Sequence, residues 1–124
     1  MRLLPSLSVA LLLTGCGSLG IEAPQTPQQA VYLLKSGYAT TLGLAVAYRT
    51  LPACGSSGAT VVCSTADGVK ILQRADDSAS AGIDTAEATV RDPKFAGTTS
   101  DKAIVAAQHS LDAFTAIANQ LKGQ

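Results

Sequence analysis

Apolar residues recur every three or four positions in three stretches of the chain, which is the spacing of one face of an α-helix. This pattern predicts helices over residues 28–50, 66–91 and 101–122. The buried face expected of the first helix comprises Val31, Leu34, Tyr38, Thr41, Ala45 and Tyr48, widened by Leu42 and Val46. The face expected of the second helix comprises Val69, Leu72, Ala75, Ala79, Ile83, Ala86 and Val90. The face expected of the third helix comprises Ile104, Ala107, Leu111, Phe114, Ala118 and Leu121.

Residues that favour helix starts precede all three stretches. Thr26 is a candidate N-cap for the first helix, because its hydroxyl can accept a hydrogen bond from a free backbone N–H of the first turn. Ser64 or Thr65 would open the second helix in the same way, and Thr99 or Ser100 the third.

Three helices of similar length joined by two short connections favour an all-α fold, an antiparallel three-helix bundle. We expect this bundle to form a single domain over residues 28–124. The content of hydrophobic residues is 47% and that of aromatic residues only 4%, which suits closely packed helices with small side chains. Gly37 and Gly43 each cost about 1 kcal/mol inside a helix, so they either permit close contact or simply weaken the helix.

The N-terminus has a different pattern. Arg2 precedes a mostly apolar run over residues 3–13, as in a secretory signal. This run is shorter than the roughly 20 residues that a membrane-spanning helix needs. It ends in Leu13-Thr14-Gly15-Cys16, which resembles the lipobox of bacterial lipoproteins. The resemblance covers these first 16 residues only and implies a signal peptide over residues 1–15, cleavage before Cys16 and a diacylglycerol on the Cys16 thiol.

The same resemblance carries an expectation about location. In lipoproteins of Gram-negative bacteria an Asp after the cysteine tends to retain the protein in the inner membrane, and this chain has Gly17 there. The resemblance therefore implies a lipid anchor, with palmitate among its chains, in the inner leaflet of the outer membrane, with the domain facing the periplasm. Residues 16–27 would be the lipidated cysteine and a flexible tether, whose 11 residues after Cys16 reach roughly 30 Å when extended.

Charge gives no argument for nucleic acid as a partner. The chain has 9 basic and 9 acidic side chains, and loss of Arg2 with the signal peptide would leave a net charge of −1. No basic face is implied, and the chain has no Trp and few other aromatic residues on which bases could stack.

Cys54 and Cys63 are the two cysteines that remain if Cys16 is lipidated. In an oxidising compartment they are expected to form a disulfide. A metal site is the alternative, but it needs more ligands, and the one histidine, His109, is distant in the sequence. The glycines and serines between the cysteines lack the Lys-Ser/Thr ending of a phosphate-binding loop, so we expect a structural loop.

Catalytic chemistry has weak candidates in this sequence. His109 lies beside Ser110 and three residues before Asp112, but it falls between core positions and is expected at the surface. A group of acidic side chains on the second predicted helix could serve acid–base chemistry or bind Ca²⁺, although a solvated helix face explains it better. This group comprises Asp76, Asp77, Asp84 and Glu87.

Tyr32 and Leu33 lie off the core face of the first helix and are candidates for a protein contact patch. We expect a lipid-anchored lipoprotein that is not an enzyme, binds no cofactor and acts through an envelope protein partner or as part of envelope structure. In general plan the mature chain resembles small hypothetical and prophage-encoded lipoproteins, without a motif that secures a named family. An accessory role in phage superinfection exclusion or lysis is one alternative, and an enzyme or small-ligand binder is another.

Overall fold

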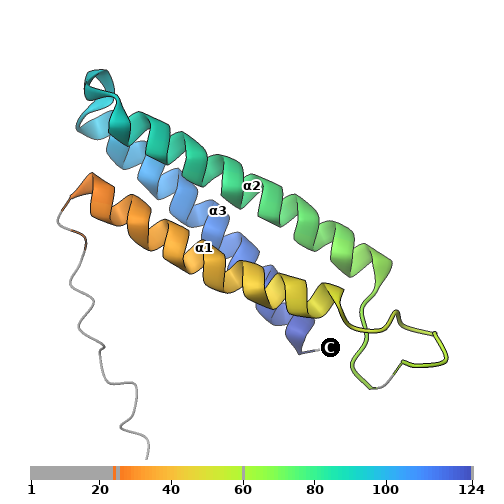
Figure 1. The fold of residues 1–124 in the computed structure, drawn as a ribbon. Coiled ribbons are helices and arrows are strands. Elements are labelled where there is room, and N and C mark those ends of the chain that lie inside the picture. Colours follow the sequence, from red (N-terminus) through yellow and green to blue (C-terminus); the bar gives the residue numbers. More distant parts are fainter. Residues whose placement is uncertain (1–23, 25, 60, 124) are drawn as a thin grey trace, which may run out of the picture.

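Three long helices pack side by side and run alternately up and down (Figure 1). The computed structural model describes residues 24, 26–59 and 61–123. The helices are α1 (Pro27–Arg49), α2 (Ala66–Arg91) and α3 (Thr98–Lys122), and a short 3-10 helix, η1 (Pro93–Phe95), lies between α2 and α3. The predicted all-α three-helix bundle is confirmed. The predicted signal peptide, residues 1–15, and the lipidation site, Cys16, lie outside the described residues.

Local capping explains where α1 and α2 begin. The Thr26 hydroxyl accepts a hydrogen bond from the backbone N–H of Gln29, and the Gln29 side chain accepts one from the backbone N–H of Thr26, both at 3.2 Å. Thr65 is the N-cap of α2, where its hydroxyl accepts a hydrogen bond of 3.0 Å from the Gly68 N–H. The reciprocal bonds of α1 and the single bond of α2 satisfy backbone donors that would otherwise lack a partner in the first turn.

The predicted start of α3 at residue 101 is wrong. The helix begins at Thr98, and its N-cap is Gly97 with a φ of 81°, a left-handed conformation that glycine adopts at little cost. Ser100, one of the two predicted caps, lies inside the first turn and is buried. Its hydroxyl donates a hydrogen bond of 2.7 Å back to the Gly97 carbonyl, so it continues the helix instead of capping it.

The core lies along the predicted faces of the three helices. Leu72, Ile83, Leu111 and Phe114 expose 5% of their surface or less. Val46 was expected to widen the face of α1, but it is 49% exposed, because it lies a further 100° around the helix from buried Ala45. The buried apolar residues are Val31, Leu34, Ala45, Tyr48, Leu72, Ala79, Ile83, Ala86, Ala107, Leu111, Phe114 and Ala118.

Glycines bring helices together at some positions and not at others. A Cβ on Gly37 would meet Leu111 Cδ2 at 3.2 Å, and a Cβ on Gly82 would meet Ala107 Cα at 3.4 Å. Gly37 thus permits close contact between α1 and α3, and Gly82 between α2 and α3. A Cβ on Gly43 would meet no atom within 4 Å, so Gly43 only weakens α1.

Polar side chains tie α1 to both other helices. The Tyr38 hydroxyl donates a hydrogen bond of 2.6 Å to Asp76 Oδ1 on α2. The hydroxyls of Thr41 on α1 and Thr115 on α3 lie 2.9 Å apart and share a hydrogen bond. Because these part-buried bonds are directional, they fix the rotation of α1 more narrowly than apolar contact alone.

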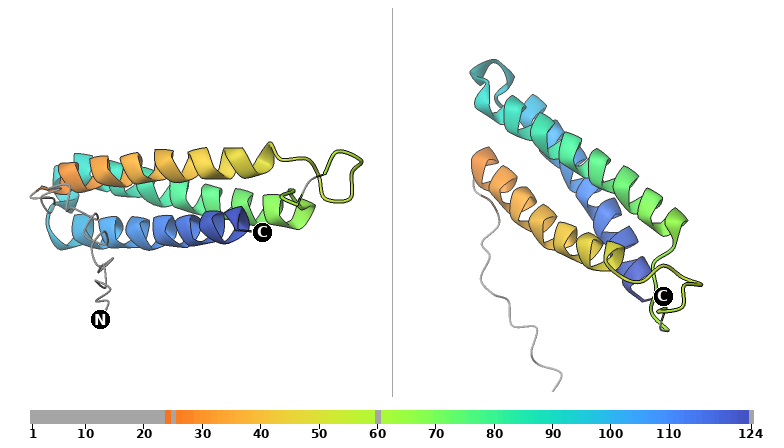
Figure 2. Two further views of the ribbon diagram at one scale, coloured as in Figure 1. Left: turned by 90° about the horizontal axis from the view of Figure 1, so that it is seen from below. Right: turned by 45° about the vertical axis from the view of Figure 1, so that its right-hand side comes forward.

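The two ends of the bundle differ in what they carry. The chain enters α1 at the end where η1 joins α2 to α3, whereas the loop between α1 and α2 and the C-terminal end of α3 lie at the opposite end (Figures 1 and 2). We call this opposite end the loop end. Any segment that precedes Pro27 therefore joins the bundle at the end farthest from the loop.

Candidate functional site

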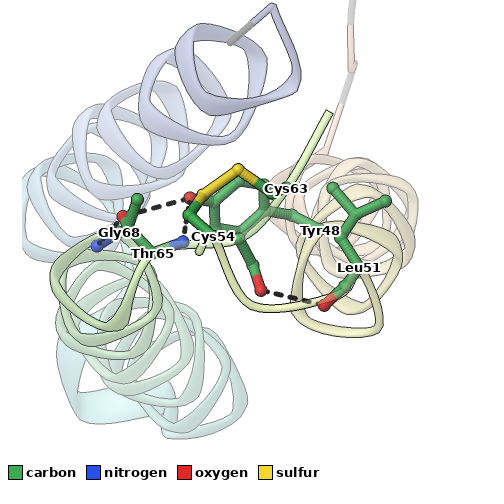
Figure 3. Close-up of a disulfide and its surroundings, with 7 residues drawn as sticks. Tyr48, Leu51, Cys54, Cys63, Thr65 and Gly68 are labelled. Atoms are coloured by element: carbon green, nitrogen blue, oxygen red, sulfur yellow. Dashed lines mark hydrogen bonds between the residues drawn. A yellow bond between two sulfur atoms is a disulfide. The ribbon is translucent and has the colours of Figure 1, made fainter. Parts of the chain in front are cut away.

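The loop between α1 and α2 is closed by its two cysteines. The sulfur atoms of Cys54 and Cys63 lie 2.00 Å apart, at bonding distance, and the two Cα atoms are 5.0 Å apart (Figure 3). Backbone hydrogen bonds close the same base: the Cys54 N–H donates to the Ser64 carbonyl and the Ser64 N–H donates to the Pro52 carbonyl, each at 2.9 Å. The loop thus leaves the bundle through a fixed base.

Tyr48 connects this base to both helices. Its ring is buried on α1, and its hydroxyl accepts a hydrogen bond of 3.0 Å from the backbone N–H of Thr65 (Figure 3). The same hydroxyl lies 3.3 Å from Thr65 Oγ1, which in turn accepts from the Gly68 N–H. The end of α1, the loop base and the first turn of α2 are therefore held by one chain of hydrogen bonds.

Gly68 is the residue that lets Tyr48 reach this position. A Cβ at Gly68 would lie 2.5 Å from the Tyr48 hydroxyl oxygen and 2.8 Å from Thr65 Oγ1. Both distances are far below van der Waals contact, so any larger residue would displace the tyrosine or the cap. The sequence pattern placed Tyr48 on the core face but gave no sign of this contact, which depends on how α1 and α2 pack.

A small apolar hollow lies beside the loop base. Its volume is about 180 Å³, and α1, the loop and the last turn of α3 all contribute to it. Val61, next to the hollow's loop residue, is 97% exposed, and Val62 itself is 44% exposed. We call this feature the loop-end hollow; its lining residues are Leu44, Ala47, Tyr48, Leu51, Val62 and Lys122.

Sequence reasoning missed the loop-end hollow. Its walls come from three segments that are distant in the chain, so no spacing along one helix reveals it. The one available signal was Val61-Val62, a pair of large apolar residues inside a loop otherwise made of small and polar residues.

The neighbours of His109 hydrogen-bond to other residues of α3. His109 is exposed on α3. The Ser110 hydroxyl donates to the Ala106 carbonyl at 3.1 Å, and Asp112 accepts a hydrogen bond of 2.7 Å from the Gln108 side chain. Both neighbours are thus engaged within α3 itself.

The acidic residues of α2 divide into two kinds. Asp77 and Asp84 are exposed, as predicted for a solvated face. Asp76 and Glu87 instead face α1. Asp76 accepts from the Tyr38 hydroxyl, and this hydrogen bond, with burial, raises the pKa of Tyr38 above its usual 10.0.

Glu87 connects α2 to α1 by one ion pair. It lies 2.5 Å from the Lys35 ammonium on α1 and also pairs with Arg91 one turn later on α2. The hydrogen bond from Lys35 lowers the pKa of Glu87 below its usual 4.5. Asp76 and Glu87 therefore serve the packing of α1 against α2.

No metal site is evident in the part of the chain that the structure describes. Among residues 24, 26–59 and 61–123, no three His, Cys, Asp or Glu side chains lie close enough together to hold an ion. The two loop cysteines face each other, as the disulfide prediction requires and the metal alternative does not.

The predicted contact patch on α1 is at the surface, with Tyr32 73% exposed and Leu33 36% exposed. None of the described helices combines the length and the hydropathy needed to cross a membrane. Cys16, the predicted lipidation site, is not among the described residues, and its modification stays a prediction. Comparison of the chain with protein-family models, with curated proteins and with solved structures found no match.

Proposed function

We propose that this chain is a lipid-anchored lipoprotein of the bacterial envelope whose helical domain faces the periplasm and acts by binding a protein partner, without catalysis. The anchor part of the proposal rests on Leu13-Thr14-Gly15-Cys16 and the apolar run before it. With two or three acyl chains, each buried CH₂ contributing about 0.8 kcal/mol, such an anchor holds a protein firmly on a bilayer.

The contact part of the proposal rests on one observation, the exposed apolar surface at the loop end. Val61 and Val62 protrude from a loop whose base is closed by a cysteine pair and by backbone hydrogen bonds. A loop whose base is fixed loses less conformational freedom on binding than an unconstrained loop, which favours recognition of a partner. The acid groups that could suggest chemistry, Asp76 and Glu87, support helix packing instead.

Labelling with palmitate tests the anchor. The wild-type chain should incorporate labelled palmitate, and the Cys16→Ser variant should not, because it lacks the thiol that carries the lipid. Cys54→Ser is the matched control, since it also removes a thiol and should keep the label. Equal labelling of the wild type and Cys16→Ser would contradict the proposal.

Cross-linking in intact cells, followed by mass spectrometry, tests the contact. A reproducible envelope partner that is lost in the Cys16→Ser form is the expected result. Turnover of a small substrate by the protein, abolished by His109→Ala or Asp77→Ala, would overturn the proposal in favour of an enzyme.

A further inference from the structure

We infer that the loop-end hollow binds the C-terminal residue of a partner protein, with that residue's apolar side chain in the hollow and its carboxylate paired with Lys122. This inference rests on the proposed function, because it names the surface and the chemistry of the protein contact.

The size of the hollow fits one side chain. Its volume is about 180 Å³, and cavities of roughly 150 Å³ in protein cores accept a benzene molecule. Leu44 and Leu51 on its wall are half-buried, so apolar surface remains for an incoming group to cover. A longer apolar segment, such as the face of a helix, would not fit into it.

The charge of Lys122 determines which group is complementary to the hollow beside the bound apolar side chain. Lys122 is the one charged residue among those that line the hollow. In the part of the chain that the structure describes, Lys122 forms no ion pair, although Lys35 and Arg91 do. The loop side of the hollow offers no carboxylate either, because residues 50–66 contain no charged side chain. An occupant that supplies one negative charge is therefore complementary to this site.

An apolar residue at the C-terminus of a protein carries both an apolar side chain and a negative charge. Its carboxylate is attached to the same Cα as its side chain, whereas an internal Asp or Glu must come from a neighbouring residue. The hollow accepts a single side chain, and Lys122 belongs to its wall. A carboxylate on the same Cα as that side chain therefore fits best. Capture of a terminal carboxylate is an established mode of peptide recognition.

The cysteine pair gives this surface its shape before binding. Val62, the loop residue of the wall, is adjacent to Cys63, whose sulfur is held by Cys54. Tyr48 is also part of the wall, and its hydroxyl is fixed by Thr65. Val62 and Tyr48 are thus each tied to the loop base, which reduces the ordering that binding requires.

Peptide titrations followed by NMR test the inference directly. The full chain in detergent micelles, with methyl groups of Leu44, Leu51 and Val62 as reporters, is titrated with three probe peptides. One is acetyl-Gly-Ser-Gly-Phe with a free carboxylate, one is the same peptide amidated, and one is amidated acetyl-Gly-Phe-Glu-Gly. We expect millimolar affinity and about two- to fivefold tighter binding of the free acid than of its amide, as for an exposed ion pair.

Matched variants show whether the effect belongs to the hollow. Lys122→Glu should abolish the preference for the acid, whereas Lys102→Glu, at an exposed lysine near the other end of α3, should keep it. Ala47→Trp fills the hollow and should abolish binding of all three peptides, whereas Ala39→Trp on an exposed part of α1 should not. Equal binding of acid and amide by the wild type, tightest binding of the internal-Glu peptide, or loss of preference in Lys102→Glu would overturn the inference.

Cross-linking of the same variants separates this inference from the proposed function. A partner that is captured by the wild type and equally by Lys122→Glu and Ala47→Trp leaves the proposed function standing and refutes the hollow as its site. Binding of the acid peptide in the hollow without any partner in cells supports the hollow and refutes the proposed function.

Discussion

Replacement of Gly68 by alanine should destabilise the domain although alanine is the better helix former. The added Cβ would lie 2.5 Å from the Tyr48 hydroxyl oxygen and 2.8 Å from Thr65 Oγ1. Tyr48 is only 4% exposed and belongs to the core, so a shift of its ring would disturb the packing between α1 and α2. We expect the clash to break the hydrogen bond from the Thr65 N–H to Tyr48 and to displace the cap of α2.

The contributions at this site set the size of the effect. Loss of an N-cap costs about 1 kcal/mol, and loss of a part-buried hydrogen bond costs about 1 kcal/mol more. The intrinsic gain of alanine over glycine offsets at most about 1 kcal/mol, and less in the first turn than in the helix interior. The net loss in the free energy of unfolding is therefore about 1–2 kcal/mol, or roughly 5–15 °C in Tm for a domain of this size.

Thermal unfolding of the purified chain, followed by circular dichroism, measures this change. Gly43→Ala is the matched control, because a Cβ there meets no atom within 4 Å; it should raise the free energy of unfolding by about 0.5–1 kcal/mol. In a Tyr48→Phe background the oxygen nearest to the new Cβ is absent, so Gly68→Ala should cost less than in the wild type. A Gly68→Ala variant that melts at or above the wild-type temperature would refute the role given to Gly68.

Three further predictions follow from the core, the loop and one ion pair. Leu111→Ala should lower the free energy of unfolding by about 2–5 kcal/mol because the side chain is only 5% exposed. Gln73→Ala, at an exposed position, should lower it by under about 0.5 kcal/mol. Equal denaturant midpoints for the two variants would be inconsistent with the core described above. The non-reduced chain should be about 2 Da lighter than the dithiol form. Joint replacement of Cys54 and Cys63 by Ala should lower the free energy of unfolding by about 2.7 kcal/mol on the chain-entropy estimate for a ten-residue loop. Two alkylatable thiols in protein from the periplasm would exclude the bridge. Since Lys35 lowers the pKa of Glu87 below 4.5, the stabilising contribution of Glu87 is present above pH 4.5 and is lost as the pH falls through the folded-state pKa. An NMR titration of Lys35→Met should show a higher pKa for Glu87, and an unchanged value would argue against the pair.

The fold could be predicted because each helix carries its own signals. The second helix was predicted over residues 66–91 and is found at Ala66–Arg91, since Thr65 provides the cap and the residue before Pro93 cannot continue an α-helix easily. The start of α3 could not be predicted in the same way. Residues 98–100 all carry a hydroxyl group, so each is a plausible helix start. Only the left-handed conformation of Gly97 determines that the helix begins at Thr98.

The candidate site depended on tertiary structure and was mostly beyond the sequence. Cysteine counting indicated the pair of Cys54 and Cys63, whose sulfur atoms meet in the structure. The requirement for glycine at position 68 arises from Tyr48, 20 positions earlier, and the loop-end hollow combines α1 with Lys122 at the end of α3. Neither the contact of Gly68 with Tyr48 nor the hollow is marked by a periodic pattern or a motif in the sequence, because each depends on where the helix ends meet.

The direction of α1 determines how far from a membrane the loop would work. A helix of 23 residues is about 35 Å long, and residues 17–26 add roughly 30 Å if they act as the proposed tether between Cys16 and α1. The loop end then explores a hemisphere of roughly 65 Å radius, and one molecule in that volume corresponds to an effective concentration of about 3 mM. An interface with a Kd of about 1 mM, far too weak to hold two freely diffusing proteins together, would be occupied about three-quarters of the time within that reach.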